Sequence, residues 1–316
     1  MSAPILVAGE ALYDLVAGGD GALIGHPGGG PFNTARTIGR LRQPVAYLGR
    51  LSSDRLGETH ERMLAADGVD LSCVLRTADP TMLALASLDV RGAASYNFYS
   101  AGTAAPGLTV EHAVAMIPPT VAALHVGSLG LVLEPLASAL EAVVERFAGH
   151  TLVMIDPNCR PCVIDDEETY RARLDRVVSV ADVIKVSDED LAWLDPGRPR
   201  AEAARGLLDC GPAAVLLTRG PEGATLLTAH GDVVIAPVPT DVVDTIGAGD
   251  AFSGGFLAWW SSHGLGRDDL GSDELLIAAG QFASLVAART VARAGASPPA
   301  LAAGVAETAP LELTSV

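Results

Sequence analysis

The stretch DTIGAGDAFSGG, residues 244–255, combines glycines and carboxylates in a pattern that could support chemistry. It leads into the apolar segment FLAWW, so a helix is expected to begin near Gly247, Ala248 and Gly249. Successive backbone N–H groups at a helix N-terminus can converge on one anion, and the helix dipole adds partial positive charge. These three residues therefore form a candidate anion hole for a group whose negative charge grows during a reaction.

A carboxylate, Asp250, directly follows this candidate anion hole. An acidic residue in the first turn of a helix is common without any catalytic role, because it complements the helix dipole. Next to an anion hole, however, a carboxylate also stands where a general base is needed. Asp250 could accept a hydroxyl proton while the hole holds a migrating phosphoryl group, so the combination indicates phosphoryl transfer.

The composition argues against several other classes of binding protein. The 316 residues carry a net charge of −17, and no run of Lys and Arg forms the basic face typical of a nucleic-acid binder. Lys185 is the only lysine, and it does not stand in a G-x-x-x-x-G-K-[ST] nucleotide loop. The first expected strand leads into GEALYD rather than a G-x-G-x-x-G motif, and Glu10 would repel a dinucleotide pyrophosphate.

Cysteine usage and hydropathy favour a cytoplasmic protein. Cys159 and Cys162 form a C-x-x-C pair in CRPC, which could be a redox pair or half of a metal site. Without a second such pair or a nearby His, ordinary reduced thiols are expected. No apolar run reaches the roughly 18 residues that a membrane span needs, and the start MSAPILVAGEAL reads as a strand rather than a signal peptide.

Apolar strand-like runs alternate with helical patterns along most of the chain. ILVAG, VAYLGR, AALHVGS, LVMIDPN, DVIKVS and AAVLLTRG read as strands, whereas PFNTARTIGRLRQ and PLASALEAVVERFAG have helical spacing. This alternation predicts an α/β fold with a mostly parallel sheet covered on both faces. Ligands bind outside the carboxyl ends of such strands, and glycines, small polar residues and carboxylates follow several of these strands.

Residues 82–100 break this rhythm and read as two strands around the turn DVRGAA. Tyr96 and Phe98 alternate onto one face, and Asn97 and Tyr99 onto the other. Together with ALYDLVAGG this hairpin is expected to form a small lid over a ligand; a plain edge hairpin is the alternative. The last segment, residues 297–316, is expected to be loosely held.

These motifs resemble the ribokinase-like, or phosphofructokinase B, family of carbohydrate kinases over nearly the whole chain. DTIGAGDAFSGGF is similar to the C-terminal signature of that family, and GGGPFNTARTIGRL followed by GRLSSDRLG is similar to the N-terminal one. GEALYD, DPNCRP and KVSDEDL look most like the bacterial fructokinase branch. The resemblance implies one ribokinase-like three-layer domain, 1–316, with a central mostly parallel sheet and β-lid segments near 11–25 and 82–104.

The resemblance also assigns roles to individual positions. Asp250 would be the catalytic base, and Gly247, Ala248 and Gly249 the anion hole. The remaining assignments fall into two groups. Asp14, Gly28, Gly29, Asn33 and Arg160 would contact the sugar or its phosphate side, with Tyr96 and Phe98 closing from the lid. Asn158, Ser187, Thr218, Gly220, Gly223 and Ser284 would lie along ATP.

The implied metal sites depart in part from the family pattern. The Mg²⁺-linked motif of the family is N-x-x-E, whereas this chain has Ser187 and Asp190 at those positions, with Glu189 as a substitute carboxylate. Many relatives also carry Asn near the position of Ser284. Asp244 and the carbonyl of Ile246 match a monovalent-cation site, although Asp244 could simply cap a turn.

The function implied by the resemblance is ATP-dependent phosphorylation of a sugar hydroxyl, with fructose 6-OH as the first choice. A 2-keto-3-deoxygluconate kinase, a ribokinase or a nucleoside kinase would use the same fold. A non-catalytic sugar- or nucleotide-binding regulator is the alternative of a different class, but it would need neither a base nor an anion hole. Mg²⁺, K⁺ and a homodimer are expected, without nucleic-acid or membrane partners.

Overall fold

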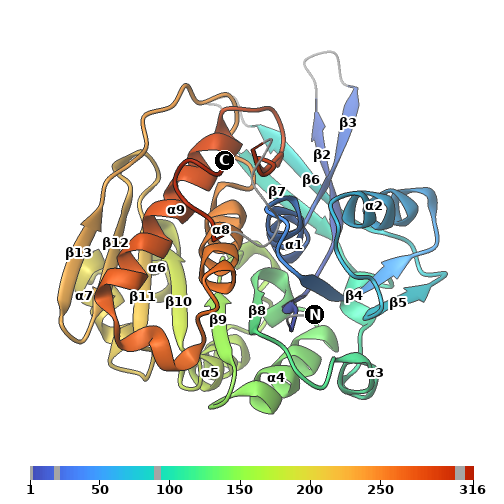
Figure 1. The fold of residues 1–316 in the computed structure, drawn as a ribbon. Helices are drawn as coiled ribbons and strands as arrows, with labels where there is room; N and C mark the ends of the chain where they lie inside the picture. Colours follow the sequence, from blue (N-terminus) through green and yellow to red (C-terminus); the bar gives the residue numbers. More distant parts are fainter. Residues whose placement is uncertain (1–2, 18–21, 89–93, 303–309) are drawn as a thin grey trace.

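A nine-stranded sheet forms the centre of the computed structural model, which describes residues 3–17, 22–88, 94–302 and 310–316 (Figure 1). Across the sheet, the strands follow the order β13 (Gly231–Ile235), β12 (Ala224–Thr228), β11 (Ala214–Thr218), β10 (Val183–Ser187), β9 (Leu152–Asp156), β8 (Ala123–Gly127), β1 (Ile5–Ala8), β4 (Val45–Ser52) and β5 (Val74–Thr77). All neighbours pair in parallel except β12, which is antiparallel to β11 and β13. The predicted mostly parallel sheet is confirmed.

Helices cover both faces of this sheet, as expected when its strands are short, continuous apolar runs. One face packs against α1 (Gly30–Arg40), α2 (Arg55–Ala66), α8 (Ala248–Ser262) and α9 (Asp273–Val291). The other face packs against α3 (Val110–Met116), α4 (Leu136–Phe147), α5 (Glu167–Val178), α6 (Asp188–Leu194) and α7 (Arg200–Leu208). Short 3₁₀ turns η1 (Ala105–Gly107), η2 (Ser128–Leu131), η3 (Pro161–Val163), η4 (Gly220–Glu222) and η5 (Arg267–Gly271) complete the three layers.

A separate four-stranded sheet lies beside α1, where the sequence predicts a lid (Figure 1). Its strands follow the order β3 (Leu23–Gly28), β2 (Leu12–Ala17), β6 (Met82–Leu88) and β7 (Ala94–Tyr99). The predicted hairpin over 82–100 is therefore confirmed as two antiparallel strands, and it pairs in parallel with β2. The turn DVRGAA and the tip of the 11–25 segment fall partly outside the described residues.

The C-terminal part of the chain corrects one expectation and qualifies another. Leu301 and Leu311 are buried, and the amide of Leu311 donates to Ser262 Oγ at 3.0 Å, so the described parts of 297–316 are docked rather than loosely held. Helix α9 is long and apolar enough to span a membrane by length and composition. Its residues Phe282 and Val286 are fully buried against α8 and the sheet, which is the position of a core helix.

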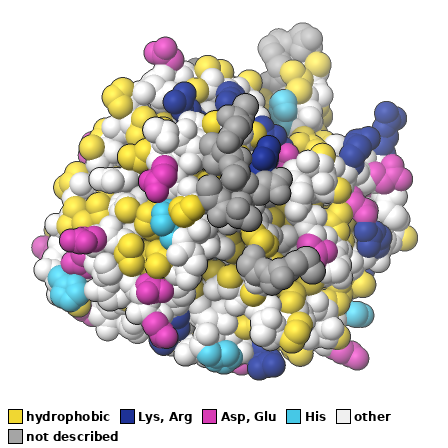
Figure 2. Space-filling model, viewed as in Figure 1, with side chains coloured by type: hydrophobic (Ala, Val, Ile, Leu, Met, Phe, Trp, Pro, Cys, Tyr) yellow, Lys and Arg dark blue, Asp and Glu magenta, His cyan; other side chains and the backbone are white. Residues whose placement is uncertain are grey.

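Charged side chains are interspersed on the face of the molecule shown in Figure 2. Arginines lie singly or in small groups there, with carboxylates and uncharged side chains between them. Among the described residues on this face, no continuous basic stripe of the kind that neutralises a phosphate backbone is seen.

Candidate active site

The N-terminus of α8 carries the glycine-rich motif, and its glycines serve different purposes. Gly247 caps the helix with φ 77°, a left-handed conformation that favours glycine. A Cβ atom on Gly254 would lie 2.7 Å from the Thr37 side chain, and one on Gly255 would lie 3.0 Å from Val286. The later glycines therefore let α8 pack closely against α1 and α9, while the first ones shape the backbone before Asp250.

Asp250 lies in the first turn of α8 and is buried. Its Oδ2 accepts a hydrogen bond from Asn33 Nδ2 at 2.9 Å, and its backbone carbonyl accepts one from Thr34 Oγ1 at 3.3 Å. Burial raises the pKa of Asp250 to about 6, opposed by the Asn33 hydrogen bond. A carboxylate with this basicity, fixed by α1, is suited to accept a proton near neutral pH.

Four chain segments meet around the free oxygen of Asp250. A Cβ atom placed on Gly30 would lie 3.3 Å from Asp250 Oδ1, 3.3 Å from Ser128 Cβ and 3.5 Å from Asn158 Nδ2. Ser128 and Asn158 follow the carboxyl ends of β8 and β9 and have φ values of 55° and 40°. Left-handed conformations in residues other than glycine carry strain and concentrate at functional sites. The absence of a side chain at Gly30 thus leaves space at the centre of this junction.

The lid contributes a second carboxylate, Asp14 on β2. Gly28 on β3 pairs with Leu12, two residues before Asp14, and a side chain on Gly28 would overlap with Asp14 Oδ2. Burial raises the pKa of Asp14 to about 6, opposed by the charges of His26 and Arg160. Gly28 therefore provides the space that the predicted sugar-contacting carboxylate occupies, and Gly29, with φ 109°, turns the chain into α1.

Arg160 electrostatically connects the lid carboxylate with Asp250. Its guanidinium donates to the carbonyls of Asn158 and Cys159 at 3.2 and 2.9 Å. Its positive charge acts to lower the pKa of both Asp14 and Asp250. Arg160 therefore acts electrostatically on both of these predicted site residues.

The strand register places Phe98 on the same face of the lid as Asp14. Ala84 on β6 pairs with Asp14 on one side and with Phe98 on the other. Directly paired residues point to the same face, and Tyr96, two residues before Phe98, shares it. The rings of Tyr96 and Phe98 are stacked with centroids 6.1 Å apart.

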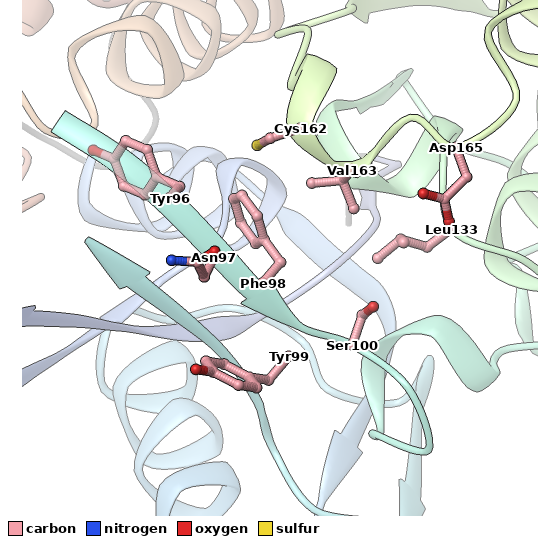
Figure 3. A pocket seen from close by; sticks show the side chains of 9 residues that line it. All are labelled: Tyr96, Asn97, Phe98, Tyr99, Ser100, Leu133, Cys162, Val163 and Asp165. Atoms are coloured by element: carbon pink, nitrogen blue, oxygen red, sulfur yellow. The ribbon is translucent and has the colours of Figure 1, made fainter. Parts of the chain in front are cut away.

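A pocket of about 420 Å³ lies between β7 and the segment around η3 (Figure 3). Tyr96 and Phe98 line it from the lid, and Figure 3 shows their rings on the side of the strand that faces Cys162 and Val163. Tyr99 points away from these two residues and is 56% exposed. The pocket borders the lid rather than Asp250, so it is not by itself the reaction centre.

The segment predicted to hold Mg²⁺ forms a capping box at the start of α6. Asp190 Oδ2 accepts from the Ser187 amide and hydroxyl at 3.0 and 2.7 Å, and Oδ1 accepts from the Cys159 amide at 2.7 Å. Both oxygens of the buried Asp190 therefore already have protein donors, whereas Glu189 is exposed. Within the described residues, no three His, Cys, Asp or Glu side chains cluster as a metal site. Mg²⁺ often needs only one or two carboxylates besides phosphate oxygens and water.

Asp244 bridges two segments at the position of the predicted monovalent-cation site. Its Oδ1 accepts from the Ile246 amide at 3.0 Å, and its Oδ2 accepts from the Gly295 amide at 2.8 Å. The amides of Val243 and Asp244 both donate to the carbonyl of Val291. Asp244 therefore caps a turn, and its remaining oxygen lone pairs are the ones that a cation would use.

Four of the residues predicted to lie along ATP come from β11, the turn that follows it and α9. Thr218 ends β11, where its Oγ1 donates to Val186 O at 3.4 Å. Gly220 begins η4 and Gly223 follows it, with φ values of 51° and 87°. Ser284 is buried in α9, the helix whose end contacts the 240–246 segment. Asn158, predicted for the same group, instead lies beside Gly30 and Asp250.

Comparison with known proteins identifies the family. The model of the pfkB family of carbohydrate kinases matches residues 5–303. The chain belongs to the pfkB family of carbohydrate kinases. This carbohydrate kinase is 36% identical over 258 residues to a fructokinase from Rhizobium leguminosarum bv. trifolii, covering 80% of this chain and 78% of the relative. It is 35% identical over 274 residues to a fructokinase from Klebsiella pneumoniae, covering 84% and 87%.

Solved structures share the ribokinase-like fold of this kinase. Fructokinase with bound ATP from Xylella fastidiosa superposes with a TM-score of 0.85 at 28% identity, covering 94% of each chain. Aminoimidazole riboside kinase from Salmonella enterica, complexed with aminoimidazole riboside and an ATP analogue, gives 0.81 at 27% identity, covering 93% and 95%. A double mutant of fructokinase from Vibrio cholerae O395, with fructose, ADP and potassium ion bound, gives 0.81 at 26% identity, covering 93% and 94%.

Sequence reasoning missed several residues that surround Asp250 in this kinase. The sequence gives Ser128 no role, and it places Glu10 at the ligand-binding edge of the sheet without assigning it a function. In the structure, Glu10 Oε2 accepts from the Gly130 amide at 3.0 Å, and burial raises the pKa of Glu10 to about 7. Lys185 and Asp156 form a buried pair at 2.9 Å. The only signals were a lone lysine within an apolar strand and an aspartate at the end of another.

The cysteines of the kinase are unpaired, as expected. Cys73, Cys159, Cys162 and Cys210 are all free. Cys159 is buried with its Sγ 3.4 Å from Tyr170 Oη, and burial raises its pKa to about 12. Such a thiol is a poor nucleophile at neutral pH.

Proposed function

We propose that this carbohydrate kinase transfers the γ-phosphoryl group of ATP to the 6-hydroxyl of fructose. The supporting observation is a buried carboxylate of raised pKa, Asp250, at the amide-rich start of α8. The related fructokinases and the fructose-bound neighbour support the choice of sugar. A binding protein would gain nothing from a buried, basic carboxylate beside an anion hole.

In this mechanism the sugar lies between Asp14 of the lid and Asp250 of the core. Asp250 accepts the proton of the attacking hydroxyl, and the oxygen forms its bond to the γ-phosphorus as the bond to the ADP oxygen breaks. The amides of Gly247 and Gly249 stabilise the charge on the transferring group, joined by the Ala248 amide if it gives up its 3.3 Å hydrogen bond to the carbonyl of Thr245. The proton remains on Asp250 until it is released after product departure.

Asn33 provides a specific place for a second sugar hydroxyl. Its Nδ2 donates to Asp250, whereas its buried Oδ1 has no partner within the described structure. A buried carbonyl oxygen without a donor is costly, so it favours a ligand that brings an O–H group. This requirement fits a polyol, and Asp14 and Arg160 can serve its other hydroxyls.

Mg²⁺ would neutralise charge on the ATP phosphates. Glu189, an exposed carboxylate at the start of α6 within the segment that matches the family motif, would bind the ion. Asp190 then serves mainly to fix this turn, because its oxygens are used by Ser187 and Cys159. A potassium ion is proposed at Asp244 and the carbonyl of Ile246. The potassium-bound neighbour supports that proposal. A homodimer and a cytoplasmic location remain predictions.

A coupled ADP-release assay with a panel of acceptors tests the proposed substrate. Fructose, ribose, 2-keto-3-deoxygluconate and aminoimidazole riboside would each be titrated at fixed ATP and Mg²⁺. Fructose is expected to give the highest kcat/KM. A higher value for the riboside would instead assign the nucleoside-kinase alternative that the Salmonella enterica neighbour represents. No turnover with any acceptor, together with ATP or sugar binding, would indicate the non-catalytic regulator.

A further inference from the structure

The only lysine of the chain lies buried directly beneath the anion hole. Lys185 is on β10, is 4% exposed, and faces the sheet side that α8 covers. A Cβ atom placed on Gly249 would lie 2.7 Å from Lys185 Nζ. The ammonium group therefore fills the space that a side chain at position 249 would take, and it supports the first turn of α8 from the sheet side.

Lys185 is paired with the carboxylate that ends the neighbouring strand. Its Nζ lies 2.9 Å from Asp156 Oδ2, and both side chains are 5% exposed. Asp156 Oδ1 has no hydrogen-bond partner among the described residues. A buried ion pair is weak evidence for stability, because desolvation offsets much of the attraction, so a functional reason for this pair is worth testing.

We propose that the Lys185–Asp156 pair is a positioning element of the catalytic centre, which fixes the Gly249 turn and keeps Asp250 available as the proton acceptor. This inference rests on the proposed role of Asp250. Asp156 and Asp250 are two buried carboxylates under one helix end, and like charges at such a site disfavour each other's ionisation. The ammonium group of Lys185 neutralises the charge of Asp156, so Asp250 can ionise and accept the proton of the sugar hydroxyl.

The charges that face Asp250 from the surrounding elements support this account. Asp156 from β9 acts to raise its pKa, whereas Lys185 from β10 and Arg160 from the loop after β9 act to lower it. Glu10, after β1, also interacts with Asp250 electrostatically, and Asn33 of α1 donates a hydrogen bond. His125 on β8 lies close to Lys185, but burial and the lysine charge lower its pKa to about 3, so it stays neutral.

The proposal predicts shifts of opposite sign for the two partners. ¹³C NMR of aspartate carboxyl carbons, with the Asp250 signal assigned by its absence in Asp250→Asn, would follow the titration directly. Lys185→Met should raise the pH at which Asp250 is half-titrated by about one unit, because it removes a nearby positive charge. Asp156→Asn should lower that pH, and the double variant should have a value close to wild type. This readout does not depend on which sugar is the substrate, so it separates failure of the inference from failure of the proposed function.

Two further measurements keep the result interpretable. Arg173→Met removes a buried cation paired with Glu141 at 3.2 Å on the opposite face of the sheet, and it should leave the Asp250 midpoint unchanged. If Lys185→Met does not fold, the titration of Asp250 in Asp156→Asn and in the double variant still tests the proposal. Asp250 midpoints that do not move in any folded variant would overturn the proposal. The proposal also predicts that Lys185→Met lowers turnover and that adding Asp156→Asn restores part of it. A double variant as impaired as Lys185→Met would overturn the proposal, because that result would mean that Lys185 contacts the phosphates itself.

Discussion

At the scale of single residues, Asp250 carries the chemistry in this account. Replacement by Asn keeps the shape of the side chain but removes the proton acceptor. Asp250→Asn is expected to lower kcat by about 10²–10⁴, while the dissociation constant of the sugar changes much less. Steady-state kinetics together with tryptophan fluorescence titration would measure both quantities. A variant that keeps a near wild-type kcat would remove Asp250 from the role of base.

The raised pKa of Asp250 sets a pH dependence with a defined sign. A general base must be ionised, so kcat/KM should fall about tenfold for each pH unit below about 6 and level off above it. Asp14 has a similar pKa and must be distinguished from Asp250. The acid limb should persist in Asp14→Asn if Asp250 is responsible; its disappearance in that variant would assign it to Asp14.

The position of a candidate site residue could be predicted from sequence only when the residues that contact it are close to it in sequence. The start of α8 at Gly247 and the position of Asp250 in its first turn were predictable, because a helix start and a following carboxylate are local in sequence. The pair of Lys185 and Asp156 was not, because it depends on which strands are neighbours and on which face each side chain lies. Ser187 and Asp190 form the capping box of α6, which the comparison with the metal motif does not reveal, and their role at Mg²⁺ and ATP stays a prediction.

At the scale of elements, the lid is the part whose role is most open to test. The register places Phe98 and Tyr96 on the face that carries Asp14. We expect Phe98→Ala and Tyr96→Ala to raise the KM for sugar by about tenfold, and the KM for ATP much less, because they remove apolar cover from the sugar. ATP hydrolysis relative to sugar phosphorylation should also rise, since a lid excludes water.

Tyr99 on the other face of β7 provides a matched control. It is an aromatic residue of the same strand and is 56% exposed. Tyr99→Ala should leave both KM values unchanged. If all three aromatic variants lower only the melting temperature and keep wild-type kinetic constants, the hairpin is an ordinary sheet edge and the lid assignment is wrong.

The segment carrying Asp244 makes a prediction about salts. Asp244 joins the 244–246 turn to Gly295, so a cation bound there would act on the backbone that leads into the anion hole. We expect K⁺ to raise kcat relative to Na⁺ at constant Mg²⁺ and ionic strength, and Asp244→Asn to abolish the difference. Equal rates of the wild-type enzyme in the two salts would argue against a functional site at this turn.

Element prediction from sequence succeeded where burial imposes a regular pattern. Continuous apolar runs identified the parallel strands, and alternation identified the β6–β7 hairpin. The sequence placed this hairpin and ALYDLVAGG in one lid, but it did not specify that β6 pairs in parallel with β2, because pairing between distant strands has no local signature. The docking of Leu301 and Leu311 was missed for the same reason: single apolar residues in an irregular segment do not show which surface they cover.

At the scale of the whole molecule, the fold brings dispersed residues to one edge of a sheet. Segments after β8 and β9 meet the N-termini of α1 and α8 there, and Asp14 of the lid lies beside Gly28, which leads into α1. Parallel topology makes this convergence a general property, because all carboxyl ends of parallel strands lie at the same edge. The fold and the motifs together therefore identify the family of the chain, whereas the choice of sugar substrate depends on a few side-chain contacts in the pocket.

The central claim, phosphoryl transfer from ATP to fructose O6, is tested most directly by the product itself. ³¹P and ¹³C NMR of a reaction containing the enzyme, fructose, ATP, Mg²⁺ and K⁺ would identify any phosphate ester and its position. The account predicts fructose 6-phosphate in amounts equal to the ADP formed, and almost none with Asp250→Asn. Formation of ADP and inorganic phosphate alone, of an ester at another position, or of equal product with Asp250→Asn would contradict it.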